Sequence, residues 1–222
     1  MNKKVLAIVF FTVFMDLVGF GIIIPIQTAY ALSFGATATV VTLLSASFSA
    51  MQFLFAPFWG GLSDRFGRRP IILSSIVFSA VGYYLFAEAG SLAVLFGARI
   101  LSGFGSANIA AAQAAVADTT TPEKRAKGMG LIGVAFGLGF IIGPVIGGIF
   151  SQWSLAGPAY ISCVLCGLNF LFALFFLPET LKKDAPRVHS QAKKGIAVIS
   201  MQSFQRAFQY PDLPRLLWLF FG

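Results

Sequence analysis

The 222-residue sequence is short of charge. Asp, Glu, Lys and Arg together make up 11% of it, against roughly 25% in soluble domains. Hydrophobic residues make up 57% and the mean hydropathy is +0.83, so too few charged side chains remain to cover an aqueous surface. This composition argues against a soluble globular fold and against a disordered chain. The number of membrane crossings becomes the main question.

Histidine and cysteine are also scarce, with one His and two Cys. Cys163 and Cys166 lie in an apolar run without a nearby histidine, which is a poor metal or redox pattern, and we expect them to serve packing. The sequence offers no phosphate-binding loop, metal cluster or nucleophile with a base at usable spacing. It therefore predicts no enzyme, no metal site and no cofactor. The net charge of +8 is expected to reflect membrane topology and not nucleic-acid binding.

Six stretches are long and apolar enough to cross a bilayer, which takes about 20 residues. They lie near 5–26, 38–60, 70–88, 92–117, 127–150 and 157–178. The predicted fold class is an all-α membrane protein with a six-helix bundle over residues 1–180. We expect residues 181–212 to form a cytoplasmic linker and residues 213–222 to begin a seventh helix that is incomplete.

Basic residues fall on alternate connections of these spans. Fifteen of the sixteen Lys and Arg lie before the first span, after the second, after the fourth or after the sixth. The positive-inside rule therefore predicts a multi-pass protein of the cytoplasmic (inner) membrane with its N-terminus in the cytoplasm. Trp59 and Trp153 are predicted to lie at the membrane interfaces.

Two fragments recur along the chain. Ala-Pro-Phe-Trp-Gly-Gly at 56–61 is echoed by Gly-Pro-Val-Ile-Gly-Gly at 143–148, and Gly-Phe-Gly at 19–21 recurs at 103–105. A repeat of three spans is odd, so the two copies enter the membrane in opposite directions. The pattern predicts two inverted three-helix repeats, as in secondary transporters.

Two charged residues, Asp16 and Arg99, lie inside predicted spans. Each costs about 2.5 to 3.5 kcal/mol at mid-bilayer on the insertion scale, so both are expected to face protein or water. We expect Asp16 to carry a proton and Arg99 to take part in proton coupling. Polar stripes on the first, second and fourth spans are expected to line a substrate cavity. The candidate cavity residues are Gln27, Thr42, Ser45, Ser49, Gln52, Asn108 and Gln113. The alternative is an Asp16–Arg99 ion pair that only holds two helices together.

The fifth span carries glycines four residues apart, with a proline among them. Gly139, Gly143 and Gly147 share one helical face, beside Pro144 and Gly148. This pattern predicts a bent helix that approaches a neighbour backbone to backbone. Either an ordinary close crossing or a kinked, dry seal would fit.

Four motifs resemble those of the major facilitator superfamily. GGLSDRFGRRP at 60–70 resembles its loop signature, and RILSGFG at 99–105 its fourth-span motif. GFIIGPVIGG at 139–148 resembles the fifth-span motif of proton-coupled drug exporters, and FMDLVGFGIIIP at 14–25 resembles the tetracycline-exporter branch.

The resemblance implies the N-terminal half of a transporter in the lipid bilayer, which exports small organic compounds in exchange for protons and uses the proton gradient in place of a cofactor. It also implies a conformational switch in which Arg68 pairs with Asp118 and Asp64 sits against the partner half. The implied switch residues are Gly60, Asp64, Arg65, Gly67, Arg68, Arg69 and Asp118. The implied fifth-span antiporter motif is Gly139, Gly143, Pro144, Gly147 and Gly148.

Several alternatives stay open at this point. The second half of the transporter is expected from a C-terminal six-helix portion, a separate chain or a second copy. A metabolite or lysolipid carrier of the same superfamily is possible, as is a non-transporting membrane subunit or fragment. Gly82 aligns where the tetracycline branch carries an acid, which argues against tetracycline as the substrate.

Overall fold

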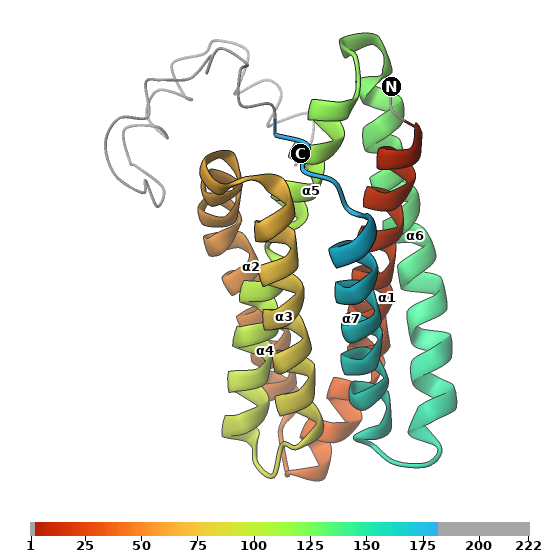
Figure 1. Cartoon of the computed structure of the whole chain (residues 1–222). Helices are drawn as coiled ribbons and strands as arrows, with labels where there is room; N and C mark the ends of the chain where they lie inside the picture. The colour runs from red at the N-terminus through yellow and green to blue at the C-terminus, as the bar shows by residue number, and fades with distance from the viewer. Residues whose placement is uncertain (1–2, 182–222) are drawn as a thin grey trace, which may run out of the picture. The chain divides into compact units, whose positions relative to one another are not determined.

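The computed structural model describes residues 3–181, and its regular structure over this range is entirely α-helical (Figure 1). The helices are α1 (Lys3–Ser33), α2 (Ala38–Phe66), α3 (Arg68–Ala87), α4 (Leu92–Ser106), α5 (Ile109–Thr119), α6 (Pro122–Ser151) and α7 (Gly157–Phe176). With α4 and α5 counted as one span, six helices in this range are long and apolar enough to cross a membrane. The all-α membrane fold class is confirmed. The predicted linker beyond residue 181 and the seventh helix lie outside the described residues.

The helices run alternately up and down, so corresponding helices of the two repeats point in opposite directions (Figure 1). In that view α1 descends and α2 ascends, whereas the α4–α5 pair ascends and α6 descends. This is the inverted arrangement that the sequence predicts. The start of α1, the α2–α3 turn, the α5–α6 turn and the end of α7 gather at one end of the bundle, which we call the basic end because Arg65, Arg68, Arg69, Lys124, Arg125 and Lys127 lie there.

Helix α1 extends further than the sequence predicts. It continues through Pro25 to Ser33, where the predicted span ends near residue 26. Gly35 ends it, with φ of +76°, and the backbone N–H groups of Gly35 and Ala36 donate to the carbonyls of Leu32 and Ala31. This is a Schellman motif, which needs a residue that tolerates left-handed backbone. Gln27 therefore lies inside a helix and not at a connection.

The fourth span is interrupted, which the sequence reasoning did not predict. Helix α4 ends at Ser106, and α5 begins at Ile109 after a turn at Ala107 and Asn108. Asn108, at the turn between the two helices, is buried, and its Nδ2 donates to Ser75 Oγ at 2.7 Å.

The glycines of α6 pack directly against α1. A Cβ atom added at Gly143 would lie 2.6 Å from the Cα of Gly21, and one at Gly139 would lie 2.8 Å from Leu17 Cβ. Gly147 faces the backbone of Ile22 in the same way. The backbones therefore approach closely, as the glycine spacing predicts, and the neighbour is α1. Gly148 lies off this seam and faces open space, while α6 continues without a break through Pro144.

Trp59 packs inside the helix bundle, whereas a tryptophan of an interfacial belt would have an exposed side chain. Its side chain is 2% exposed and its Nε1 donates to the carbonyl oxygen of Phe104 at 2.7 Å. The indole ring packs against the rings of Phe78 and Phe104. Trp59 is buried because α2 packs against α4 at this point. The hydropathy of one span does not show which helix that span will pack against. Trp153, in contrast, is exposed.

Candidate functional site: a polar and aromatic cavity with a charge network at one end

A cavity of about 510 Å³ lies among α1, α2, the α4–α5 region and α6. A volume of this size suits a small organic molecule. Its polar lining comprises Asp16, Ser49, Gln52, Ser106 and Gln113. Its aromatic lining comprises Phe20, Phe48, Phe53, Phe136 and Phe140. The wall therefore offers hydrogen-bonding groups, one acid and several ring faces, which together match an amphipathic organic ligand.

Asp16 is the acid in this wall. Its side chain is 8% exposed, and its Oδ1 is buried without a hydrogen-bond partner. Within residues 3–181 it forms no ion pair with Arg99, so the alternative of an Asp16–Arg99 pair is not what the structure contains. A buried carboxylate oxygen without a partner is costly, and such groups occur mainly where a function requires them.

Arg99 lies behind the aromatic wall and does not line the cavity. Its guanidinium carbon is 4.5 Å from the ring centre of Phe48 and 5.9 Å from that of Phe20. These two rings stack on each other at 4.7 Å and face the cavity. The rings attract the buried cation and separate it from the cavity.

The predicted cavity residues separate into three groups. Ser49, Gln52 and Gln113 line the large cavity with Asp16, and Gln52 Nε2 donates to the carbonyl of Ser106 at 3.2 Å. Gln27 and Ser45 hydrogen-bond to each other outside it.

Thr42 is exposed and its hydroxyl donates back to the carbonyl of Ala38. Asn108 lines a second, smaller cavity. The sequence predicts that the whole polar stripe of α2 lines the cavity. In the structure only its second part, Ser49 and Gln52, does so.

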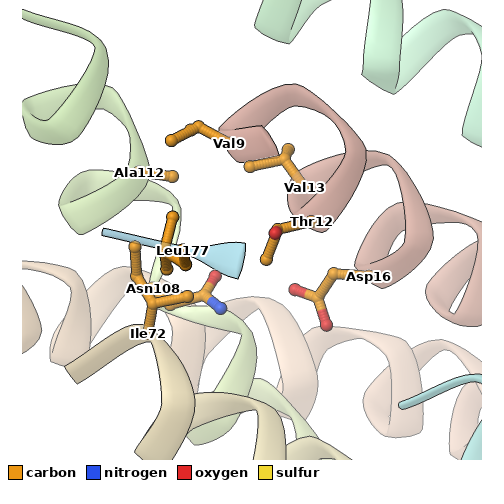
Figure 2. Close-up of a pocket in the computed structure, with 8 residues that line it drawn as sticks. All are labelled: Val9, Thr12, Val13, Asp16, Ile72, Asn108, Ala112 and Leu177. Atoms are coloured by element: carbon orange, nitrogen blue, oxygen red, sulfur yellow. The ribbon is translucent and has the colours of Figure 1, made fainter. Parts of the chain in front are cut away.

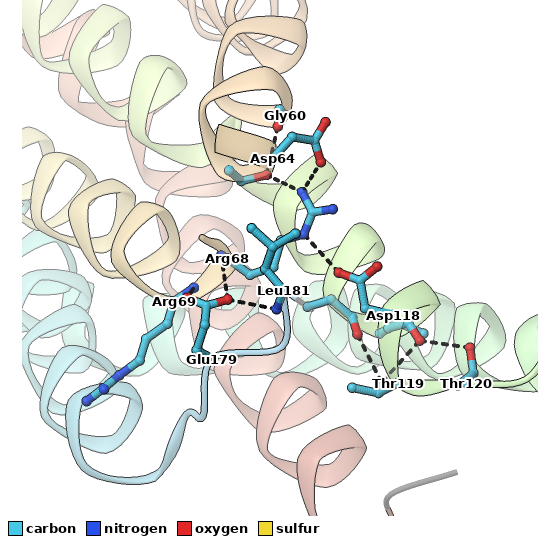
Figure 3. A network of polar contacts seen from close by, with 12 residues as sticks. Gly60, Asp64, Arg68, Arg69, Asp118, Thr119, Thr120, Glu179 and Leu181 are labelled. Carbon is cyan, nitrogen blue, oxygen red and sulfur yellow. Dashed lines mark hydrogen bonds and ion pairs between the residues drawn. The ribbon is translucent and has the colours of Figure 1, made fainter. Parts of the chain in front are cut away.

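Arg68 is the centre of a charge network at the basic end (Figure 3). Its Nε donates to Asp118 Oδ2 at 3.0 Å, and its Nη1 lies 2.5 Å from Asp64 Oδ1 and 2.6 Å from Ser63 Oγ. The guanidinium thus joins the end of α2 to the end of α5. Arg68 is buried, whereas the Asp64 side chain is 67% exposed and can meet another protein surface.

Glu179, which follows α7, completes this network and was missed by the sequence reasoning. Its two carboxylate oxygens accept hydrogen bonds from the backbone N–H groups of Arg68 and Arg69, at 2.9 and 3.2 Å (Figure 3). Oε1 also accepts from the backbone N–H of Leu181. An acid placed against a helix N-terminus is favourable, but the sequence places this acid in a polar segment far from α3.

The remaining switch residues support this corner. Gly67 has φ of +110°, and a Cβ there would collide with the Glu179 carboxylate, so the turn needs glycine. Arg69 Nη2 donates to the Leu174 carbonyl on α7. Gly60 faces Ala110, and Arg65 lies on the surface with its guanidinium over the Phe66 ring. Within residues 3–181 no group of three His, Cys, Asp or Glu comes together as a metal site would need.

Six membrane-length helices in two inverted repeats, with a polar and aromatic cavity and a charge network at one end, have the architecture of one half of a secondary-transporter fold. The sequence profile of the Major Facilitator Superfamily matches residues 8–222. The chain belongs to this superfamily.

Several relatives are similar over much of this chain. The tetracycline resistance protein of class E from Escherichia coli is 39% identical over 239 residues, which cover 100% of this chain and 58% of that protein. The class C protein from the same organism is 32% identical, and the matched region covers 59% of that protein. The chain thus spans somewhat more than half the length of these relatives. Their names describe resistance proteins and not enzymes.

Solved structures show the same fold. The human organic anion transporter MFSD10 (TETRAN) matches with a TM-score of 0.69 at 30% identity, covering 81% of this chain and 48% of that one. A peptide transporter, POT (E310Q mutant), matches with a TM-score of 0.68 at 19% identity and supports the fold alone. Both neighbours are about twice as long as the matched region.

Proposed function

We propose that this chain forms one half of an exporter that moves small amphipathic organic compounds out of the cytoplasm in exchange for protons. The observation that carries the proposal is Asp16, a buried acid with an unpartnered oxygen in the wall of a 510 Å³ polar and aromatic cavity. Protonation would remove the charge of Asp16, and this change would alter the fit of a bound substrate. Family membership and the similarity to tetracycline resistance proteins support transport of organic compounds.

The second half of the transporter would come from a C-terminal six-helix unit or from a second copy. The exposed carboxylate of Asp64 and the open side of the cavity are the surfaces we assign to it. The positive-inside rule supports placing the basic end in the cytoplasm of an inner-membrane protein. Alternating access would then rock the two halves about the cavity.

Proton flux tests this function. In vesicles carrying the complete transporter, with both halves, substrate movement should drive protons across the membrane in the opposite direction. Without substrate, this proton flux should be absent. Asp16→Asn should abolish this substrate-dependent flux while the protein still inserts, because Asn has the same shape but cannot release a proton. Asp16→Glu serves as the matched control and should retain part of the flux. Unchanged flux in the Asn variant would remove Asp16 from the proton role.

The substrate class is best tested with a panel that includes organic cations, neutral amphipathic drugs and organic anions. The aromatic wall and the single acid favour cationic or neutral amphipathic compounds. The organic anion transporter among the structural neighbours makes anions the relevant comparison. Competitive binding of anions alone would contradict the preference expected from Asp16.

A further inference from the structure

A second cavity touches Asp16 on the side away from the aromatic wall. It is small, about 10 Å³, and Figure 2 shows the residues around it. They are Val9, Thr12, Val13, Asp16, Ile72, Asn108, Ala112 and Leu177. None of these residues except Asp16 lines the large cavity. The Asp16 side chain therefore separates two spaces that share no other wall residue.

The small cavity has the size and the polar groups that one water molecule needs. A void of about 10 to 15 Å³ holds a single water when two to four polar partners surround it. Asp16 Oδ1 is buried without a partner and can accept a hydrogen bond. The Asn108 amide faces Asp16 and interacts directly with its carboxyl group, and its Nδ2 donates to Ser75 Oγ (Figure 2). The Thr12 hydroxyl donates to the Ile8 carbonyl, which leaves its oxygen free to accept.

A hydrophobic layer separates this cavity from the basic end. It consists of Val9, Ile72, Ala112 and Leu177, all buried. Ile72 lies one helical turn beyond Arg68, and Leu177 precedes Glu179 by two residues. The charge network that Arg68 and Glu179 form therefore lies directly beyond the layer. A movement of that network would also move Ile72 and Leu177, because they belong to the same chain segments.

We propose that the small cavity binds one water molecule, and that Asp16 exchanges its proton with the basic end through this water and not through the substrate cavity. The Asp16 carboxylic acid gives its proton to the water, which becomes hydronium, and the carboxylate remains. The proton passes the hydrophobic layer when the Arg68 network opens, and the water is restored. Such a route lets Asp16 exchange protons while substrate fills the large cavity.

The other charged and titratable groups around Asp16 do not offer this route. Tyr83 on α3, Arg99 on α4 and Cys166 on α7 interact with Asp16 or with each other electrostatically. None of the three lines the small cavity. The lining residues from α1, α3, α5 and the end of α7 include Asp16 as their one ionisable group.

The inference rests on the proposed proton role of Asp16. The experiment is chosen so that failure of the water route can be told from failure of that role. The complete transporter in proteoliposomes is subjected to a pH jump on the basic-end side, with saturating substrate present. The infrared C=O band of protonated Asp16, assigned with Asp16→Asn, reports the rate of exchange. Ala112→Val fills the small cavity and should slow exchange by roughly tenfold or more, the effect of losing one hydrogen-bond partner of a charged group.

Two further variants keep the test informative. Ala110→Val is the matched control, because Ala110 lies on the same helix but lines the large cavity, and it should weaken substrate binding while leaving the exchange rate unchanged. Leu177→Ala opens the hydrophobic layer and should speed exchange. Retained substrate binding would show that Ala112→Val is folded. If Ala112→Val does not fold, the faster exchange expected for Leu177→Ala still tests the water route.

The outcomes separate cleanly. If Asp16→Asn abolishes proton flux but neither Ala112→Val nor Leu177→Ala changes the exchange rate, the water route is overturned and the exporter function stands. Exchange that stops when substrate saturates the large cavity also overturns the separate route. If flux survives Asp16→Asn, the proposed proton role of Asp16 fails, and the water route fails with it.

Discussion

Glu179 Oε1 accepts a hydrogen bond from the backbone nitrogen of Arg68 at 2.9 Å, across 111 residues of sequence. The contact joins the segment that follows α7 to the first residue of α3. It places a negative charge at a helix N-terminus and leaves the Arg68 side chain free to pair with Asp64 and Asp118. One acid thus orients the arginine at the centre of the charge network.

Glu179→Ala should lower the free energy of unfolding by about 1 to 2 kcal/mol, because two backbone N–H groups at the start of α3 lose their acceptor. Thermal and denaturant unfolding in detergent measure the change. Glu88→Ala is the control, since Glu88, which is exposed, accepts a hydrogen bond from the Tyr160 hydroxyl and its loss should cost less than about 0.5 kcal/mol. Equal losses for both variants would contradict a capping role for Glu179.

Asp118→Asn should be more destabilising than Asp64→Asn. Both acids contact Arg68, but the Asp118 side chain is 28% exposed and that of Asp64 is 67% exposed. We expect a loss of about 1 to 2 kcal/mol for Asp118→Asn and less than about 0.5 kcal/mol for Asp64→Asn. Transport assays on the same variants test whether Asp64 acts in transport and not in the stability of the bundle. Asp64→Asn should reduce transport without destabilising this bundle, and a matching loss of stability would refute that.

Gly82→Ala should destabilise the bundle, and Gly82→Asp should do so more strongly. A Cβ at Gly82 would lie 2.8 Å from the backbone nitrogen of Ser102, so α3 and α4 would have to separate. The expected cost is about 1 to 3 kcal/mol, as for other overpacked positions. Gly97→Ala on α4, where nothing lies within 4 Å, should be neutral or slightly stabilising. Yield of folded protein and thermal unfolding measure both. Folded Gly82→Asp protein that unfolds at the same temperature as the unmodified protein would show that the helices can accommodate the acid.

Gly143→Ala should disrupt the seam between α1 and α6, whereas Gly148→Ala should not. The first Cβ would lie 2.6 Å from Gly21 Cα and the second faces open space. We expect a loss of about 1 to 3 kcal/mol for Gly143→Ala. Cross-linking of cysteines placed on the two helices reports their separation. An unchanged cross-linking rate in Gly143→Ala would argue against a backbone contact.

Arg99→Lys should be destabilising although it keeps the charge. The planar guanidinium lies 4.5 Å from the Phe48 ring centre, and an ammonium group cannot stack there in the same way. Desolvated cation–π contacts contribute about 2 kcal/mol. In a double-mutant cycle, Phe48→Leu and Arg99→Lys together should lower the free energy of unfolding by less than the sum of their separate effects. Strictly additive effects would show that the two side chains are not coupled.

The sequence by itself determined the membrane class, the six spans and their inverted order. Span length and the placement of Lys and Arg depend on the bilayer, which acts on each segment separately, so local composition is sufficient. The glycine spacing around Gly143 likewise predicted a close helix crossing, because a four-residue period defines one helical face. The major facilitator motifs supplied the family.

Only the tertiary structure decided which polar residues meet. The fourth span is interrupted at Ala107 and Asn108, Arg99 lies behind Phe20 and Phe48, and Gln113 reaches the cavity. Glu179 caps α3 from the segment that follows α7, and Asp16 stands between two cavities. Helical periodicity fixes the face of a residue within its own helix. The partner on another helix depends on how all six spans pack, which is a property of the assembled bundle.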